Sequence, residues 1–151
     1  MLTDHQIEEI RQFNRRYTRV LGVLNKKVFD TDLTWPEGRI LIEVGLNHIK
    51  NPMTLAKELK LDKSYASRTI NKLVKRGILE KYSSPNDLRS VELKLTPYGQ
   101  EVFNDINQRS NYLMKEVLAT LNEEQQTEFL KSIESINRLL FGEETKKDVE
   151  G

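Results

Sequence analysis

Two short amphipathic helices joined by a polar turn, between Met53 and Gly77, constrain the fold of this chain more than any other stretch. Asn51 followed by Pro52 predicts the start of the first helix, because Asn can cap the free backbone N–H groups and Pro fits the first helical position. Asp62 can cap the second helix. Both helices carry an apolar stripe at helical spacing: Leu55, Ala56 and Leu59 in the first, and Ala66, Ile70, Leu73 and Val74 in the second. The pattern predicts a helix-turn-helix.

The other face of the second helix is polar or cationic. In a helix-turn-helix, the N-terminal part of this helix enters the major groove of DNA. Arg and Asn can form bidentate hydrogen bonds with base edges, whereas Ser, Tyr and Lys reach phosphates. The face therefore indicates a DNA contact, and the alternative is a solvated helix packed on an ordinary small domain. Its residues are Lys63, Ser64, Tyr65, Ser67, Arg68, Asn71, Lys72 and Lys75.

Charge is unevenly distributed along the 151 residues, although the formal net charge is only +1. Between Lys50 and Lys81, nine Lys or Arg stand against three acids, a net charge of +6. From Gly99 to Gly151, six bases stand against eleven acids, a net charge of −5. A basic centre in a nearly neutral chain is typical of a localised contact with a polyanion.

Composition excludes several classes of protein. The sequence has no cysteine, which excludes disulfides and thiol-based redox or metal sites. His5 and His48 stand in separate segments, so we expect no metal site and no cofactor. No apolar run approaches the length of a membrane span or signal-peptide core, so we expect a cytoplasmic protein with no membrane partner. We expect no enzyme either, because no nucleophile, base and orienting group stand at motif spacing.

A long amphipathic helix is predicted over about residues 3–29, where Thr3 and Gln6 can form a capping box. It is too long to be covered by a small winged core, so its apolar stripe requires the C-terminal segment or a second subunit. The stripe consists of Ile7, Ile10, Phe13, Tyr17, Val20, Leu21, Leu24 and Val28.

A second capping box, Thr34 with Glu37, predicts a buried helix that begins near Trp35. Its expected core residues are Ile40, Leu41, Val44 and Leu46. Trp35 stands where this helix meets the long first one. Pockets for small molecules form at such joints, although a Trp that seals a helix start is the commoner case.

Beyond Gly77 the period changes from helical to alternating, which predicts strands over Ile78–Tyr82 and Val91–Leu95. The Ser-, Pro- and Asn-rich segment between them is a turn, so the two strands form a hairpin, the wing. Arg89 near its tip suits the narrow minor groove of DNA, and Asp87 is placed to hold its guanidinium. The alternative is a plain surface ion pair.

Two further helices follow the wing, the first capped by Thr96 with Pro97 and the second by Asn122 with Gln125. The predicted fold is mainly α with a small β-hairpin wing. It consists of a winged helix-turn-helix over about residues 35–96 between long helices over about 3–29 and 97–141, within a single domain, 1–142. The charged segment 143–151 is expected to be a disordered tail.

This order of elements resembles the MarR family of bacterial transcription factors over nearly the whole chain. The most specific similarity is DLRSVELKLTPYG, Asp87–Gly99. Ser67 and Arg68, followed by Leu73 and Gly77, also stand where the family has a Ser/Thr-Arg pair, Leu and Gly. Leu88 departs from the second wing arginine of many members, so wing contacts are expected to be weaker or more apolar.

The resemblance implies a homodimer formed through the first and last helices, with one winged helix-turn-helix in each subunit. Two recognition helices about 34 Å apart would bind a pseudo-palindromic operator in double-stranded DNA, and we expect a repressor. Base discrimination is expected from Arg68, Ser64, Tyr65 and Asn71. Phosphate contacts are expected from Lys57, Lys60, Lys63, Lys72 and Lys75.

Family members commonly bind small anionic aromatic molecules between the dimerisation helices and the winged domain. By this resemblance Phe13, Arg16, Tyr17 and Trp35 are a candidate effector pocket, in which Arg16 would pair with a carboxylate. Binding of such a small aromatic or anionic ligand is expected to release the DNA.

Arg11–Leu24 is similar to a subgroup in which the regulator is fused to a GNAT-type acetyltransferase, and the acetyltransferase half is expected to be absent. A different class of function is a winged-helix protein-interaction module without specific DNA readout. The basic centre argues against that module, because docking alone gives no reason to keep Arg68, Lys72, Lys75 and Arg89 on one surface.

Overall fold

The computed structural model describes residues 1–22, 31–86 and 89–142. In the described residues it contains six helices and one two-stranded antiparallel hairpin, which confirms the predicted fold class. The chain divides into two units, residues 1–111 and 112–151, and each is described by itself. The assignment of residues 1–142 to a single domain stays a prediction.

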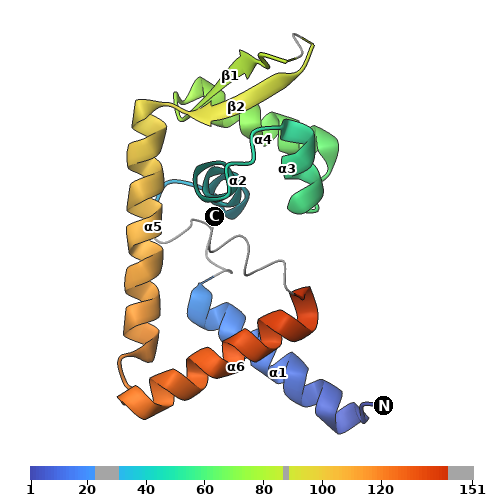
Figure 1. The fold of residues 1–151 in the computed structure, drawn as a ribbon, viewed down its shortest axis with the longest axis vertical. Coiled ribbons are helices and arrows are strands. Elements are labelled where there is room, and N and C mark those ends of the chain that lie inside the picture. The colour runs from blue at the N-terminus through green and yellow to red at the C-terminus, as the bar shows by residue number, and fades with distance from the viewer. Residues whose placement is uncertain (23–30, 87–88, 143–151) are drawn as a thin grey trace. The chain divides into compact units, whose positions relative to one another are not determined.

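The winged helix-turn-helix lies in the first unit (Figure 1). Its elements are α2 (Trp35–Leu46), α3 (Pro52–Glu58), α4 (Lys63–Lys75), β1 (Leu79–Ser83) and β2 (Val91–Leu95). The local signals in the sequence act as predicted. Thr34 and Glu37 form the capping box of α2, and the Asn51 side chain accepts hydrogen bonds from the N–H groups of Met53 and Thr54 at the start of α3.

The wing is an antiparallel ladder in which Leu79 pairs with Leu95, Lys81 with Leu93, and Ser83 with Val91. These pairs share one face of the hairpin, and Leu93 on that face is fully buried. The backbone N–H of Leu93 also donates to the carbonyl oxygen of Lys50 at 2.8 Å. The hairpin is thereby fixed to the segment between α2 and α3.

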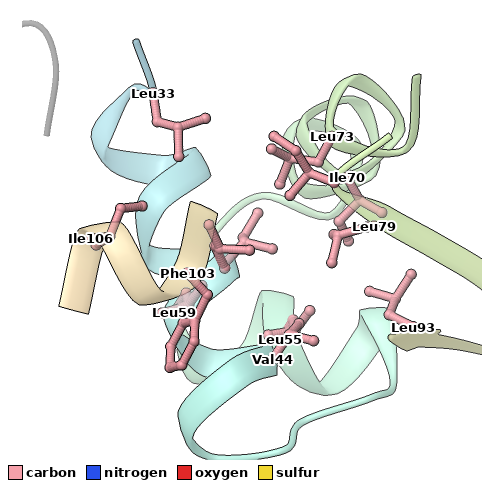
Figure 2. Close-up of a cluster of buried hydrophobic side chains, with 13 residues drawn as sticks. Leu33, Val44, Leu55, Leu59, Ile70, Leu73, Leu79, Leu93, Phe103 and Ile106 are labelled. Carbon is pink, nitrogen blue, oxygen red and sulfur yellow. The ribbon is translucent and has the colours of Figure 1, made fainter. Parts of the chain in front are cut away.

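Among the described residues, thirteen buried side chains form one core beneath α4 (Figure 2). Figure 2 shows side chains from α2, α3, α4, the hairpin and α5 pointing into this cluster. Phe103 and Ile106 contribute from α5 (Pro97–Leu118). Leu46, predicted to be buried, is 56% exposed because it follows Val44 by two residues and so lies on the opposite side of α2.

Thr96 joins the wing to α5. Its side-chain oxygen accepts a hydrogen bond from the Gly99 N–H at 2.9 Å and donates to the backbone carbonyls of Gly77 and Ile78, which confirms the predicted cap. Gly99 itself is required for close packing, because a Cβ atom there would lie 2.0 Å from the Ile78 carbonyl oxygen. The start of α5 is therefore held against the start of β1.

The first helix, α1 (Asp4–Leu21), begins with the predicted capping box of Thr3 and Gln6. It ends before the predicted residue 29, because Gly22 adopts the left-handed conformation, with φ +70°, and stops the helical hydrogen bonding. Residues 23–30 lie outside the described residues. None of the described residues of α1 is buried, and Ile7, Ile10 and Phe13 in its apolar stripe are 42%, 50% and 52% exposed.

The second unit contains the end of α5 and α6 (Glu123–Phe141). Asn122 and Gln125 form the predicted capping box of α6. The described helix has no buried residue, and Leu139 and Leu140 are 77% and 71% exposed. The predicted tail, 143–151, lies outside the described residues.

Candidate nucleic-acid interface

The turn between α3 and α4 sets the direction of the second helix. Lys60 adopts the left-handed conformation, with φ +52°, and the next N–H, of Leu61, donates to the Ala56 carbonyl oxygen at 2.9 Å. The Asp62 carboxylate then accepts a hydrogen bond from the Tyr65 N–H at 3.1 Å, which confirms Asp62 as the cap of α4. Lys60, Leu61 and Asp62 therefore end α3 and begin α4.

Helix α4 has a buried face and an exposed face, as its sequence period predicts. Ala66, Thr69, Ile70 and Leu73 are buried, and the Thr69 hydroxyl donates to the Tyr65 carbonyl oxygen at 2.9 Å. Every predicted DNA-contact residue of this helix is exposed. These are Lys63, Ser64, Tyr65, Ser67, Arg68, Asn71, Lys72 and Lys75.

The end of α4 is tied to the start of α2 by Arg76. Its guanidinium lies 2.7 Å from the Asp32 carboxylate and 3.6 Å from the Glu37 carboxylate. Glu37 is only 7% exposed, and its other carboxylate oxygen accepts the Thr34 N–H at 2.8 Å. Arg76 therefore neutralises a buried carboxylate, and we assign it to the support of α4 even though it contributes to the basic total of the segment.

Unlike Arg76, the cations on the exposed face of α4 form no ion pair with the described residues. Among the described residues, none of the ion pairs engages Lys63, Arg68, Lys72 or Lys75. The Arg68 guanidinium lies over the Tyr65 ring, 6.0 Å from its centroid, which orients the side chain without neutralising its charge. This face therefore keeps its positive charge for an external anion.

A contact between α4 and the wing was not predicted. The Lys81 ammonium of β1 donates a hydrogen bond to the side-chain oxygen of Asn71. From the sequence alone, Lys81 is one of the nine bases of the basic centre and has no assigned contact. The alternation of residues in β1 could have identified this contact. It places Lys81 on the same face of the strand as the buried Leu79, which is the face toward the core and α4.

A pocket of about 300 Å³ opens beside this contact, between α3, α4 and the hairpin. Its walls are largely apolar, with Lys63, Ser67 and Lys81 as the polar exceptions. The lining residues are Pro52, Met53, Ala56, Lys63, Ala66, Ser67, Ile70, Lys81 and Val91. Lys81 of the hairpin and Ser67 of α4 therefore line the same pocket.

The wing loop is closed by the Ser84 N–H, which donates to the Ser90 carbonyl oxygen at 2.9 Å. Arg89 is exposed on this loop, as predicted. Asp87 and Leu88 lie outside the described residues, so the bond between Asp87 and Arg89 stays a prediction.

On the outer face of the hairpin, Lys94 lies 3.6 Å from the Glu80 carboxylate and over the ring of Tyr82. A hydrogen bond with Glu92 raises the pKa of the Tyr82 phenol above its ordinary value. These side chains pair with one another across the strands. They indicate an outer face that stabilises the hairpin.

Two of the four candidate effector residues contact each other. Phe13 and Tyr17 stack on α1, with ring centroids 5.5 Å apart and an interplanar angle of 12°. Arg16 is exposed on the same helix, whereas Trp35 packs against the core of the winged helix-turn-helix. The structure thus supports an aromatic surface on α1, and a pocket shared by all four residues stays a prediction.

The described parts of the chain contain neither a metal site nor a membrane-spanning helix. No group of three or more His, Cys, Asp or Glu side chains there is arranged to hold a metal ion. In these same residues, none of the helices combines the length and the apolar character that a membrane span requires.

Comparison with known proteins shows which family the central part of the chain resembles. Residues 33–91, which comprise α2, α3, α4 and the first strand and loop of the wing, match the model of the MarR family. Over this segment the chain is similar to the MarR family. The match contains Ser67, Arg68 and Gly77 from the predicted resemblance. It begins after Arg11–Leu24, so the similarity of that segment to the acetyltransferase-fused subgroup stays a prediction.

Two curated relatives are named as regulators. The chain is 34% identical over 80 residues to the HTH-type transcriptional regulator BilQ of Clostridioides difficile, a match that covers 50% of this chain and 54% of BilQ. It is 30% identical over 87 residues to the multiple antibiotic resistance protein MarR of Salmonella typhimurium, covering 58% of this chain and 60% of that MarR. The chain thus spans little more than half the length of these relatives.

A solved structure shows the same fold. The crystal structure of Streptococcus pneumoniae FabT in complex with DNA superimposes with a TM-score of 0.73 at 19% identity, covering 89% of this chain and 96% of the FabT chain. At this identity the likeness concerns the fold. It covers more of the chain than the family match does.

The Arg76 contacts lead to a stability prediction. Arg76→Met should lower the free energy of unfolding by about 1–3 kcal/mol, because it leaves the Glu37 carboxylate with one partner fewer at a nearly buried position. Urea unfolding measures this change. Lys75→Met, at the exposed neighbouring position, is the control and should change stability by about 0.5 kcal/mol or less. Equal losses in the two variants would contradict the supporting role of Arg76.

Proposed function

We propose that this protein is a sequence-specific regulator of transcription that binds double-stranded DNA through α4 and the wing. The observation that carries the proposal is the exposed face of α4, on which four cations stand outside every ion pair of the described residues while the opposite face is fixed in the core. A rigid helix that presents unpaired Lys and Arg beside a hairpin has the geometry of a major-groove reader with a wing.

The family supports the same proposal. BilQ is named as a transcriptional regulator, and FabT has been crystallised with DNA. We assign major-groove contacts to Lys63, Ser64, Tyr65, Ser67, Arg68, Asn71, Lys72 and Lys75, and wing contacts to Asp87 and Arg89. Regulators of this kind are not enzymes, and we propose that the protein acts on DNA in the cytoplasm.

The apolar stripe of α1 and the exposed end of α6 favour a homodimer. Ile7, Ile10 and Phe13 would be costly to leave in water along one face of a helix. A second copy of the chain can cover them, and two-fold symmetry would present two recognition helices about one DNA turn apart to a pseudo-palindromic operator. We therefore propose a dimeric repressor in which α1, α5 and α6 supply the interface.

An effector would bind at the aromatic surface of α1. The stacked rings of Phe13 and Tyr17 offer an apolar contact, and the neighbouring Arg16 offers a charge for a carboxylate or phenolate. We propose that a small aromatic or anionic ligand binds there and releases the DNA. Such a ligand shifts the protein only by its different affinity for the DNA-competent and DNA-incompetent forms.

The second candidate is a protein-interaction module that uses the winged helix for docking. The exposed apolar residues Met53 and Tyr65 beside α4, 63% and 41% exposed, are the observation that favours it. Docking gives no reason for the unpaired cations of α4, however. DNA binding accounts for both the cations and the wing, so we place it first.

Alanine substitutions test the DNA proposal. Arg89→Ala should weaken binding to all duplexes alike and lower the salt slope of log K by about one, because it removes a phosphate or minor-groove contact. Arg68→Ala should also reduce the preference for the operator over a random duplex, by about 1–3 kcal/mol for one bidentate base contact. Fluorescence anisotropy at several salt concentrations measures both effects, with the DNA upstream of the protein's own gene as a first operator candidate.

Lys131→Ala, on the exposed surface of α6, is the matched control and should leave affinity and salt slope unchanged. Wild-type affinity in the Arg68 and Arg89 variants would remove the proposed contacts. Equal, weak binding of the wild-type protein to every duplex would favour the interaction module.

The dimer proposal predicts a change in oligomeric state. Ile10→Asp should shift the protein from dimer to monomer at micromolar concentration, because it would bury a charge in the subunit interface. Sedimentation equilibrium measures this shift. Gln12→Asp adds the same charge to the opposite side of α1 and should leave a dimer. A wild-type monomer, or a dimer unaffected by Ile10→Asp, would exclude α1 from the interface.

The effector proposal predicts binding that depends on α1. Titration calorimetry with salicylate should give a heat of binding that Arg16→Ala and Tyr17→Ala both abolish, because the first removes the charge and the second half of the aromatic stack. Gln12→Ala on the same helix should bind like the wild type. Binding retained in both pocket variants would place the ligand elsewhere.

A further inference from the structure

The hydrogen bond between Lys81 and Asn71 fixes the orientation of the Asn71 amide. An ammonium group has three donors and no acceptor, so it can face only the amide oxygen. The Lys81 Nζ atom therefore occupies the Oδ1 side of Asn71. The amide nitrogen, with its two N–H donors, is left on the other side of the side chain.

The fold places Lys81 at this position. Lys81 pairs with the buried Leu93 across the hairpin, so its stem leaves the inner face of the wing. Lys81 lines the same pocket as Ile70 and Val91, and its ammonium group reaches Asn71 on α4. The ladder and the buried Leu93 restrict the stem, so the contact is a feature of how the wing packs on the helix.

Asn71 lies in the middle of the exposed face of α4. It follows Ser67 by four residues and Arg68 by three, which places all three side chains on one side of the helix. If α4 enters the major groove as proposed above, the Asn71 amide faces base edges. The present inference rests on that proposed function.

An Asn that reads adenine uses both of its amide atoms, since the oxygen accepts from the adenine amino group while the nitrogen donates to N7. Asn71 has its oxygen engaged by Lys81. Together the two side chains present donors alone: the amide N–H groups and the remaining ammonium hydrogens.

We infer that Asn71 and Lys81 act as a single donor-only reader that selects a keto base, guanine or thymine, over adenine or cytosine at one position of each half-site. In the major groove, guanine O6 and thymine O4 are acceptors, whereas adenine N6 and cytosine N4 are donors. Lys81 is the positioning residue of this pair. It converts an asparagine that would otherwise suit adenine into one that cannot accept a hydrogen bond from the adenine amino group.

Selection from a randomised duplex library tests the inference with the full-length protein. The wild type should enrich a keto base at one position of each half-site. Lys81→Met keeps the length of the stem and removes the donor, so it should raise the relative affinity for adenine at that position by about tenfold, within the range for one bidentate base contact. Lys81→Arg should keep the keto preference, because a guanidinium is also donor-only.

Asn71→Ala separates this mechanism from a general effect of the lost charge. In the Asn71→Ala background, Lys81→Met should weaken binding to all sequences equally and leave the base preference unchanged. Urea unfolding curves should be alike for all variants, because Lys81 and Asn71 are exposed.

Three outcomes would overturn the inference. One is an unchanged base preference in Lys81→Met, the second is the same gain of adenine in the Asn71→Ala background, and the third is an amino base already enriched by the wild type at the position that Asn71 controls. A wild-type protein that enriches no sequence at all would instead overturn the proposed function, and the donor-only reader with it.

Discussion

The burial of one face of α4 is the interaction on which the rest of the winged helix-turn-helix depends. Helix α3 and the two-stranded hairpin are too short to be stable alone, because isolated short helices and single hairpins are marginal in water. Each becomes stable by placing side chains against Ile70 and Leu73, as Leu55 and Leu93 do. Every element that surrounds the proposed DNA-contact face is thus held in place by the residues on the opposite, buried face of α4.

Two polar connections then restrict the helix that the core has positioned. Arg76 joins the end of α4 to the start of α2, and Lys81 joins its middle to the wing. Arg76 also stabilises the fold through its contact with the nearly buried Glu37, whereas Lys81 is exposed and contributes little to stability. Both reduce the freedom of α4 to rotate or slide on the core, which matters because the contacts with base edges that we propose for this helix would be directional.

Local signals in the sequence were sufficient for much of the fold. The caps at Thr3, Thr34, Asn51, Asp62 and Asn122 form as predicted, because a cap depends only on residues within one turn. The exposed face of α4 follows from helical period in the same way. The DNA contacts assigned to that face, and the pairing of Asp87 with Arg89, are not tested by the fold. The contacts of Arg76 and Lys81 were not predicted because their partners lie on other elements. A single sequence does not show which residues of different elements are close in space.

Lys60 places a positive charge at a backbone position where a side chain costs some stability. Its left-handed backbone, with φ +52°, is a conformation in which glycine has no steric penalty and most other residues lose about 1 kcal/mol. Glycine would make a firmer turn but would remove a cation from the approach to α4. Under the proposed DNA-binding function, the turn between the two helices would combine a mechanical role with an electrostatic one, and a variant selected only for heat resistance would be expected to lose the second.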